Sequence, residues 1–129
     1  MAPIANPKVE IVVLDKIKTF IKENVVEIKA ATLATLDKLT NLPHTRSLTE
    51  LVDKENRIYE AKVGVTDHWI RIFWFWYKPS GQNSKVVATH AYLKKENKTD
   101  PNEIKVAKKI KNNYEAQQAD IYKQQKKRH

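Results

Sequence analysis

The feature that most constrains the fold of this chain is residues 69–77, where six of nine residues are aromatic and the others are isoleucine or arginine. Aromatic and β-branched residues favour strands, so this run predicts a β-strand. Strand-like stretches at 58–63 and 85–93 flank it, and turn-forming residues separate the three at 64–67 and 78–84. The middle of the chain therefore predicts three consecutive strands of one sheet.

Before these strands the sequence predicts one further strand and two helices. Residues 9–14 are rich in β-branched side chains and predict a short strand. Apolar residues then recur every three or four positions across 16–24 and again across 26–40, which predicts two helices. The proline and short polar residues of 41–51 predict a loop, and residues 1–7, with two prolines, predict a flexible lead-in.

After the third strand the chain has a well-marked helix start. Asp100 is the predicted N-cap, Pro101 the first helical residue and Glu103 the reciprocal partner of a capping box. Apolar residues from Val106 onward share one face and predict about five turns of helix. The polar and basic residues 120–129 are expected to fray.

The predicted order of elements is β-α-α-β-β-β-α, without an internal repeat or a linker. A chain of 129 residues has the usual size of one domain, so residues 1–129 are expected to form a single unit. Helices packed on one face of a mostly antiparallel sheet make the predicted fold class α+β.

Composition limits the classes of partner and of site. The formal net charge of +9 favours a polyanionic partner, which leaves nucleic acid, an acidic protein or an anionic membrane surface open. The absence of cysteine excludes disulfides, a thiolate nucleophile and cysteine-based zinc sites. The first residues do not resemble a signal peptide, and the longest apolar run, 72–77, is far shorter than the roughly 20 residues that span a bilayer. We therefore expect a cytoplasmic protein without a membrane partner.

The alternation of side chains along strands predicts which candidate residues share a face. His90, Tyr92 and Lys94 alternate along one strand, and Arg71 alternates with aromatic residues along its neighbour. An arginine in mid-strand is costly to bury alone, so Arg71 either reaches an anion or pairs with Glu60 of the adjacent strand as a structural ion pair. His90 has two interpretations of the same kind, a structural histidine or a participant in chemistry.

Lysines gather where the third of these strands ends and the last helix begins. Lys94, Lys95 and Lys98 follow His90 and Tyr92 and precede a helix N-terminus, whose free N–H groups also attract anions. Aromatic side chains beside fixed cations are what an RNA site requires. The four histidines show no metal-ligand spacing and the chain has two glycines, so no metal, glycine-rich phosphate loop or cofactor is predicted.

The same segment carries a recognisable order of residues: His90-Ala91-Tyr92-Leu93-Lys94-Lys95, then Lys98-Thr99, then Glu103-Ile104 with Ala107. It resembles the C-terminal signature of the phage-derived Gp49-like and HigB toxins of the RelE superfamily. Further resemblances lie upstream at Arg46-Ser47-Leu48, Tyr59-Glu60-Ala61-Lys62 and Arg71-Ile72-Phe73-Trp74-Phe75. The chain departs from the family pattern at Asp100, which stands where the family has proline, and at Lys62, which replaces an arginine and loses its bidentate geometry.

This resemblance implies a RelE-like fold and the toxin of a type II toxin–antitoxin system. Such a toxin is an endoribonuclease that cuts messenger RNA, commonly on the ribosome and without a metal, and a helix-turn-helix antitoxin neutralises it. The ribose 2′-oxygen attacks the adjacent phosphorus, which gives a 2′,3′-cyclic phosphate and a 5′-hydroxyl. The predicted roles are stabilisation of the phosphate by Arg71 and Lys94 and proton transfer by His90 or Tyr92. The predicted RNA-binding residues are Lys62, Lys95, Lys98 and Arg46.

Two other functions fit the same residues. A non-catalytic module of phage or mobile-element origin would bind RNA or a protein and release no cleavage products. A structural or interaction protein would use its basic face only to match an acidic partner and would have little affinity for RNA. A short neighbouring gene that encodes a helix-turn-helix protein would favour the toxin over both.

Overall fold

The computed structural model describes residues 9–41, 47–79, 81–95 and 98–127, and its fold is α+β. The core is a five-stranded sheet with the strand order β1-β5-β4-β3-β2. In chain order the elements are β1 (Ile11–Val13), α1 (Asp15–Glu23), α2 (Val26–Asn41), β2 (Thr49–Asp53), β3 (Ile58–Val65), β4 (His68–Tyr77), β5 (Lys85–Lys94) and α3 (Pro101–Lys127). None of the helices in the described ranges is long and apolar enough to cross a membrane.

The sheet is mixed, and most of its pairings are antiparallel, as predicted. The pairs β2–β3, β3–β4 and β4–β5 are antiparallel, whereas β1 lies parallel to β5 at one edge. The helices α1 and α2 connect β1 to β2, which is the strand at the opposite edge of the sheet.

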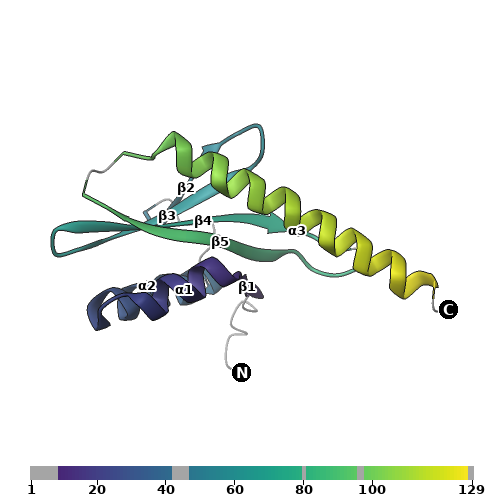
Figure 1. Ribbon diagram of the computed structural model, residues 1–129, viewed down its shortest axis with the longest axis horizontal. Helices are drawn as coiled ribbons and strands as arrows, with labels where there is room; N and C mark the ends of the chain where they lie inside the picture. The colour runs from purple at the N-terminus through teal and green to yellow at the C-terminus, as the bar shows by residue number, and fades with distance from the viewer. Residues whose placement is uncertain (1–8, 42–46, 80, 96–97, 128–129) are drawn as a thin grey trace, which may run out of the picture.

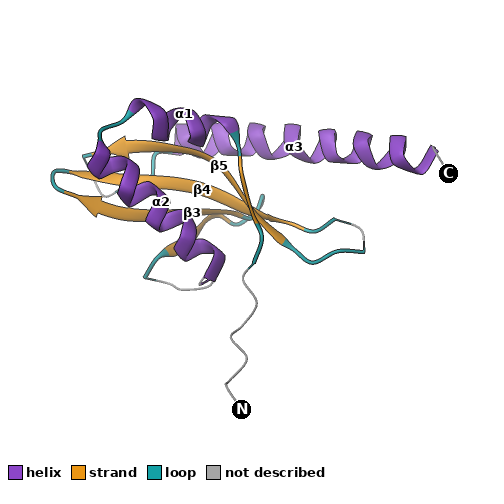
Figure 2. Cartoon of the chain, turned by 90° about the horizontal axis from the view of Figure 1, so that it is seen from below, coloured by secondary structure: helices purple, strands orange, loops and turns teal. Residues whose placement is uncertain are grey.

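Helices cover both faces of the sheet, so the expectation of helices on one face is wrong. Figure 1 shows α1 and α2 on one side and α3 on the other, and Figure 2 shows α1 and α2 in front of the sheet with α3 behind it. The reason lies in β4, which carries large apolar side chains on both faces. Ile72 and Trp74 belong to the cluster that packs against α1 and α2, whereas Phe73 packs with Ala107 of α3. Two apolar faces require two covering layers.

The strand β2 was not predicted, because residues 41–51 were interpreted as a loop. β2 is an edge strand with a β-bulge between Leu51 and Asp53 and with Glu50 and Leu51 exposed. Edge strands with charged, exposed side chains show little alternation of apolar residues, so the sequence pattern does not reveal them. The backbone hydrogen bonds to β3 hold β2 in the sheet. The observed order is therefore β-α-α-β-β-β-β-α.

The last helix is longer than predicted. α3 has 27 residues and runs to Lys127, whereas the sequence pattern indicated about five turns. Its second half continues past the end of the sheet in Figure 1, so its side chains there are not required to be apolar. Fraying of this end stays a prediction, and the predicted flexible residues 1–7 lie outside the described residues.

Candidate functional site

The strand register places most of the predicted site residues on the face of the sheet that α3 partly covers, which we call the α3 face. One row across β3, β4 and β5 consists of Lys62, Arg71 and Tyr92. The next row towards the centre consists of Glu60, Phe73 and His90. In the row on the other side, Gly64 lies opposite Trp69, and Trp69 lies opposite Lys94.

A β-bulge in β5 produces this arrangement. The register between β4 and β5 shifts at one point, because Phe73 pairs with His90 while Trp74 pairs with Ala88. Thr89 is the extra residue, and its hydroxyl donates to the carbonyl of Phe73 at 3.2 Å. A bulge changes the face on which the following residues lie, and here it brings His90 and Tyr92 to the α3 face.

Arg71 is fully buried and pairs with Glu60, which is also fully buried. Arg71 Nη1 donates to Glu60 Oε1, and the Thr99 hydroxyl donates to the same oxygen at 3.0 Å. The predicted pairing of Arg71 with Glu60 is therefore confirmed, while its role in catalysis stays a prediction. Direct contact between its guanidinium and a phosphate requires this pair to open, since neither side chain reaches solvent.

The sequence indicated Glu60 only as a possible ion-pair partner of Arg71 and gave it no role in chemistry. Burial raises its pKa above the ordinary value, and the charge of Arg71 and the hydrogen bond from Thr99 act in the opposite direction. Its second oxygen, Oε2, is buried without a hydrogen-bond partner among the described residues. The available signal was the position of Glu60 on the strand next to Arg71, but that position does not distinguish a structural carboxylate from a reactive one.

His90 is held between Glu103 of α3 and the bulge residue Thr89. Its Nε2 lies 2.8 Å from Glu103 Oε2 and its Nδ1 lies 3.1 Å from the Thr89 hydroxyl. Burial lowers the pKa of His90, and the neighbouring Glu103 carboxylate opposes this shift. A neutral imidazole that donates its Nε2–H to Glu103 accepts at Nδ1 from the Thr89 hydroxyl, which then cannot also donate its one proton to the Phe73 carbonyl.

Tyr92 stacks on Phe73, with ring centroids 5.8 Å apart, and its hydroxyl oxygen accepts the backbone N–H of Asp100 at 3.4 Å. Burial raises the pKa of Tyr92 to about 12. The phenol therefore keeps its proton at neutral pH, which allows it to donate a hydrogen bond but makes it a poor base.

The start of α3 confirms one half of the predicted capping box and corrects the other. Asp100 Oδ1 accepts the backbone N–H of Asn102 at 2.9 Å, as an N-cap residue does. Glu103 was expected to return to the N–H of Asp100, but that N–H points to Tyr92 and the Glu103 carboxylate pairs with His90. The Glu103 side chain and the Asp100 N–H, which the sequence pattern paired with each other, instead attach the first turn of α3 to β5.

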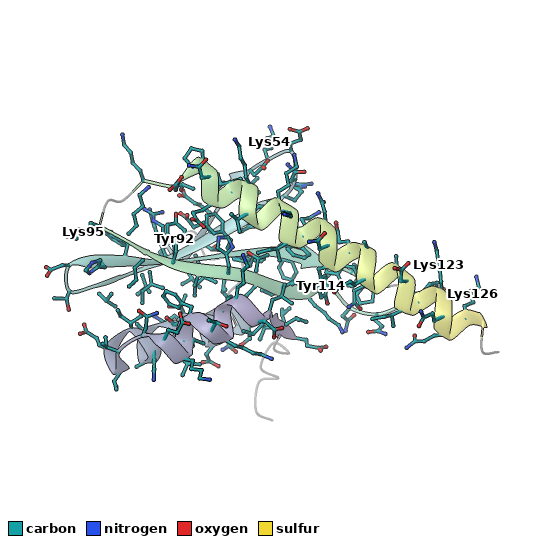
Figure 3. All side chains as sticks on the ribbon, in the orientation of Figure 1. Lys54, Tyr92, Lys95, Tyr114, Lys123 and Lys126 are labelled. Atoms are coloured by element: carbon teal, nitrogen blue, oxygen red, sulfur yellow. The ribbon has the colours of Figure 1, made fainter. Side chains whose placement is uncertain are left out.

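The lysines of the predicted site are the accessible part of it. Lys62 and Lys94 are half-buried, and Lys95 and Lys98 are exposed. Figure 3 shows Lys95 at the end of β5 and Tyr92 further along the same strand, close to the first turns of α3. Arg46, the remaining predicted RNA-binding residue, lies outside the described residues.

Two hollows are lined in part by residues of β3 that belong to this site. The smaller, of about 90 Å³, is lined by residues that include Glu60 and Lys62. The larger, of about 400 Å³, includes Lys62 and Trp69. Within the four described ranges, no group of three histidine, aspartate or glutamate side chains is placed to hold a metal ion.

Comparison with known proteins identifies one family. Residues 15–112 match the family model described as phage derived protein Gp49-like, a family related to the RelE and HigB toxins. The match begins at α1, covers β2 to β5 and ends within α3, so it includes every residue of the candidate site. A search of curated proteins and a search of solved structures each give no significant match.

Proposed function

Because this chain belongs to the phage-derived Gp49-like family, we propose that it is the toxin of a type II toxin–antitoxin system and that it cleaves messenger RNA. The observation that carries the proposal is the α3 face, where lysines and aromatic side chains surround a buried carboxylate–arginine pair. Such a toxin would act in the cytoplasm on translated messenger RNA, and a helix-turn-helix antitoxin would neutralise it. We propose a RelE-like topology for the same reason.

The proposed reaction is attack of the ribose 2′-oxygen on the adjacent phosphorus, with a 2′,3′-cyclic phosphate and a 5′-hydroxyl as products. Such a reaction needs cations that stabilise charge on the phosphorane-like transition state. Lys94 and Lys62 are accessible enough to contact the phosphate, and Lys95 and Lys98 extend the same basic surface. Arg71 lies buried beneath these lysines. It would contact the phosphate after its ion pair with Glu60 opens.

Proton transfer has three candidates with different properties. Tyr92 keeps its proton and is suited to donate to the leaving oxygen. His90, with its lowered pKa, and Glu60, with its raised pKa, are both suited to accept the proton of the 2′-hydroxyl. Both acceptors are buried, so the proposed reaction requires RNA binding to displace the first turn of α3.

Expression in bacterial cells without an antitoxin tests the proposal. Wild type is expected to arrest growth and to yield RNA fragments with 2′,3′-cyclic phosphate ends, also when the purified protein is assayed with a chelator. Lys94→Ala is expected to lose activity by about thirtyfold or more, since one positioned cation at a transition state contributes roughly 2 kcal/mol or more. Lys126→Ala removes the same charge at the far end of α3 (Figure 3) and serves as the matched control.

Together with Lys94→Ala, Arg71→Ala in the same assay tests the assignment of the site independently of the proposed function. Absence of both growth arrest and cleavage in wild type would contradict the toxin proposal as a whole. Full toxicity of both Arg71→Ala and Lys94→Ala would contradict the site while leaving the function intact.

A non-catalytic binding module is the second candidate, and one observation favours it. Arg71 pairs with Glu60 and His90 pairs with Glu103 inside the protein, as structural residues do. In that case the protein would bind RNA or a protein partner through the exposed lysines and release no cleavage products.

A further inference from the structure

The larger hollow beside the candidate site contains an aromatic residue to which no role has been assigned. It has a volume of about 400 Å³ and is lined by Trp69 and Lys62 of the sheet, Lys38 of α2, and Ser47 and Leu48 ahead of β2. Pockets of roughly 300–1,000 Å³ are the usual size for a small ligand or one unit of a polymer. The hollow shares Ser47, Leu48 and Lys62 with the smaller one that Glu60 lines, so the two are neighbours.

Trp69 is positioned by the residue opposite to it. Gly64 is its register partner on β3, and a Cβ atom at Gly64 would lie 3.6 Å from Trp69 Cζ3. The indole therefore lies against a position without a side chain and crosses β3 towards the hollow. Trp69 remains half-buried, in contrast to Trp74, which is fully buried in the core.

Cations surround this indole. The Nζ of Lys62 lies 6.0 Å from the centroid of the Trp69 ring, and Lys94 is the register partner of Trp69 on β5. Lys38 lines the same hollow from α2, and no carboxylate is among the described residues that line it. Thr35 and Ser47 add hydroxyl groups that can hydrogen-bond to a base or a sugar.

An aromatic wall with lysines around it matches the chemistry of a nucleotide. Bases of single-stranded nucleic acid stack on aromatic side chains whatever their sequence, while lysines hold the backbone phosphates. We propose that this hollow is a subsite for one unpaired nucleotide of an RNA chain, next to the nucleotide pair that is cut. The base stacks on Trp69, and Lys38 and Lys62 hold the flanking phosphates. The choice of RNA as ligand rests on the proposed function.

Binding of a short fluorescent RNA tests this subsite without cleavage. The RNA carries 2′-O-methyl riboses, which remove the attacking hydroxyl, and binding is measured by fluorescence anisotropy. Trp69→Leu is expected to weaken binding about tenfold, and Trp69→Phe, which keeps an aromatic face, is expected to retain most of the affinity. Lys38→Gln is expected to weaken binding more than Lys18→Gln, which removes an equal charge from the exposed side of α1.

An RNA series with one abasic position at a time locates the stacked base. Wild type is expected to lose affinity at one position, and Trp69→Leu is expected to be insensitive at that same position. Equal binding by wild type and Trp69→Leu, or an equal loss in both at every abasic position, would overturn the subsite.

Cleavage of the unmodified RNA separates the two proposals. If wild type cleaves RNA while Trp69→Leu binds as tightly as wild type, the subsite is wrong and the proposed function stands. If wild type cleaves nothing while binding depends on Trp69 and on one base, the proposed function is wrong and the subsite stands.

Discussion

Both faces of β4 bury apolar side chains, but one of them also buries charged groups. Ile70, Ile72 and Trp74 pack towards α1 and α2 in a cluster of apolar residues. Arg71 lies between them in sequence but on the α3 face, where Glu60 and His90 are buried as well. Both faces are buried at the centre of the strand, yet among these buried residues only those of the α3 face are ionisable.

This contrast separates the apolar side chains that stabilise the fold from the ionisable side chains that the fold holds in place. Burial of apolar side chains stabilises a folded chain by roughly 1.5–3 kcal/mol each, whereas a buried ion pair seldom adds net stability. The α1 and α2 face therefore accounts for most of the stability. The α3 face keeps an ion pair and a histidine at an energetic cost, which is typical of functional sites.

Separating the members of the buried ion pair is expected to have the largest effect. Arg71→Met leaves the Glu60 carboxylate buried without its partner and is expected to lower the free energy of unfolding by roughly 3–5 kcal/mol. Glu60→Met combined with Arg71→Met replaces both charges by apolar groups and is expected to recover most of this loss. Urea denaturation of wild type, the two single variants and the double variant gives the coupling energy between the two positions.

The double variant also tests the face as a site. It is expected to fold, because methionine side chains retain the packing. It is expected not to cleave RNA, because it lacks the carboxylate and the guanidinium. A double variant no more stable than Arg71→Met would show that the two charges are not coupled, and the contrast between the faces would then be wrong.

On the opposite face, a truncation of similar burial is expected to have a somewhat smaller effect of another kind. Ile72→Ala leaves a cavity in the apolar cluster and is expected to lower the free energy of unfolding by roughly 2–4 kcal/mol. Ile72 packs against several residues and has no single partner. We therefore expect no second truncation on that face to recover the lost stability, in contrast to the double variant of Glu60 and Arg71. Urea denaturation measures the loss, and RNA cleavage per folded molecule is expected to stay close to that of wild type. A large loss of cleavage by folded Ile72→Ala would show that the faces are not separable.

The sequence predicted the α1 and α2 face better than the α3 face, for physical reasons. Apolar periodicity indicates a helix and a strand that pack together, and it located α1, α2 and β4 closely. Alternation also predicted correctly that His90 and Tyr92 share a face. Their position opposite Phe73 and Arg71 depends on the bulge at Thr89, and a bulge of one residue leaves no pattern in composition.

Glu103 shows the same limit for the helix start. Its spacing from Asp100 indicated a capping box, and the Asp100 cap formed as that pattern predicts. The carboxylate of Glu103 instead pairs with His90, because β5 brings an imidazole within 2.8 Å of it. Local sequence specifies what a side chain can do, and the packing of a distant strand decides which of those contacts it makes.

The smallest expected effect is a dependence of stability on pH that belongs to the α3 face alone. Burial lowers the pKa of His90 below its ordinary value of 6.5, so the unfolded chain binds a proton at this residue more readily than the folded chain. The free energy of unfolding is therefore expected to fall as the pH decreases from about 7 through the pKa of His90 in the folded protein. The effect is modest because the Glu103 carboxylate, which favours the imidazolium, opposes the desolvation that disfavours it.

His90→Gln removes the titrating group and is expected to flatten this part of the profile, while His68→Gln, on β4, is the matched control. Urea denaturation at several pH values between 5 and 8 measures the slope for each variant. If wild type and His90→Gln have the same slope, His90 does not resist protonation in the folded protein. A slope of the opposite sign, with stability rising as the pH decreases, would show that Glu103 raises the pKa of His90, and its proposed role would then change from accepting a proton to donating one.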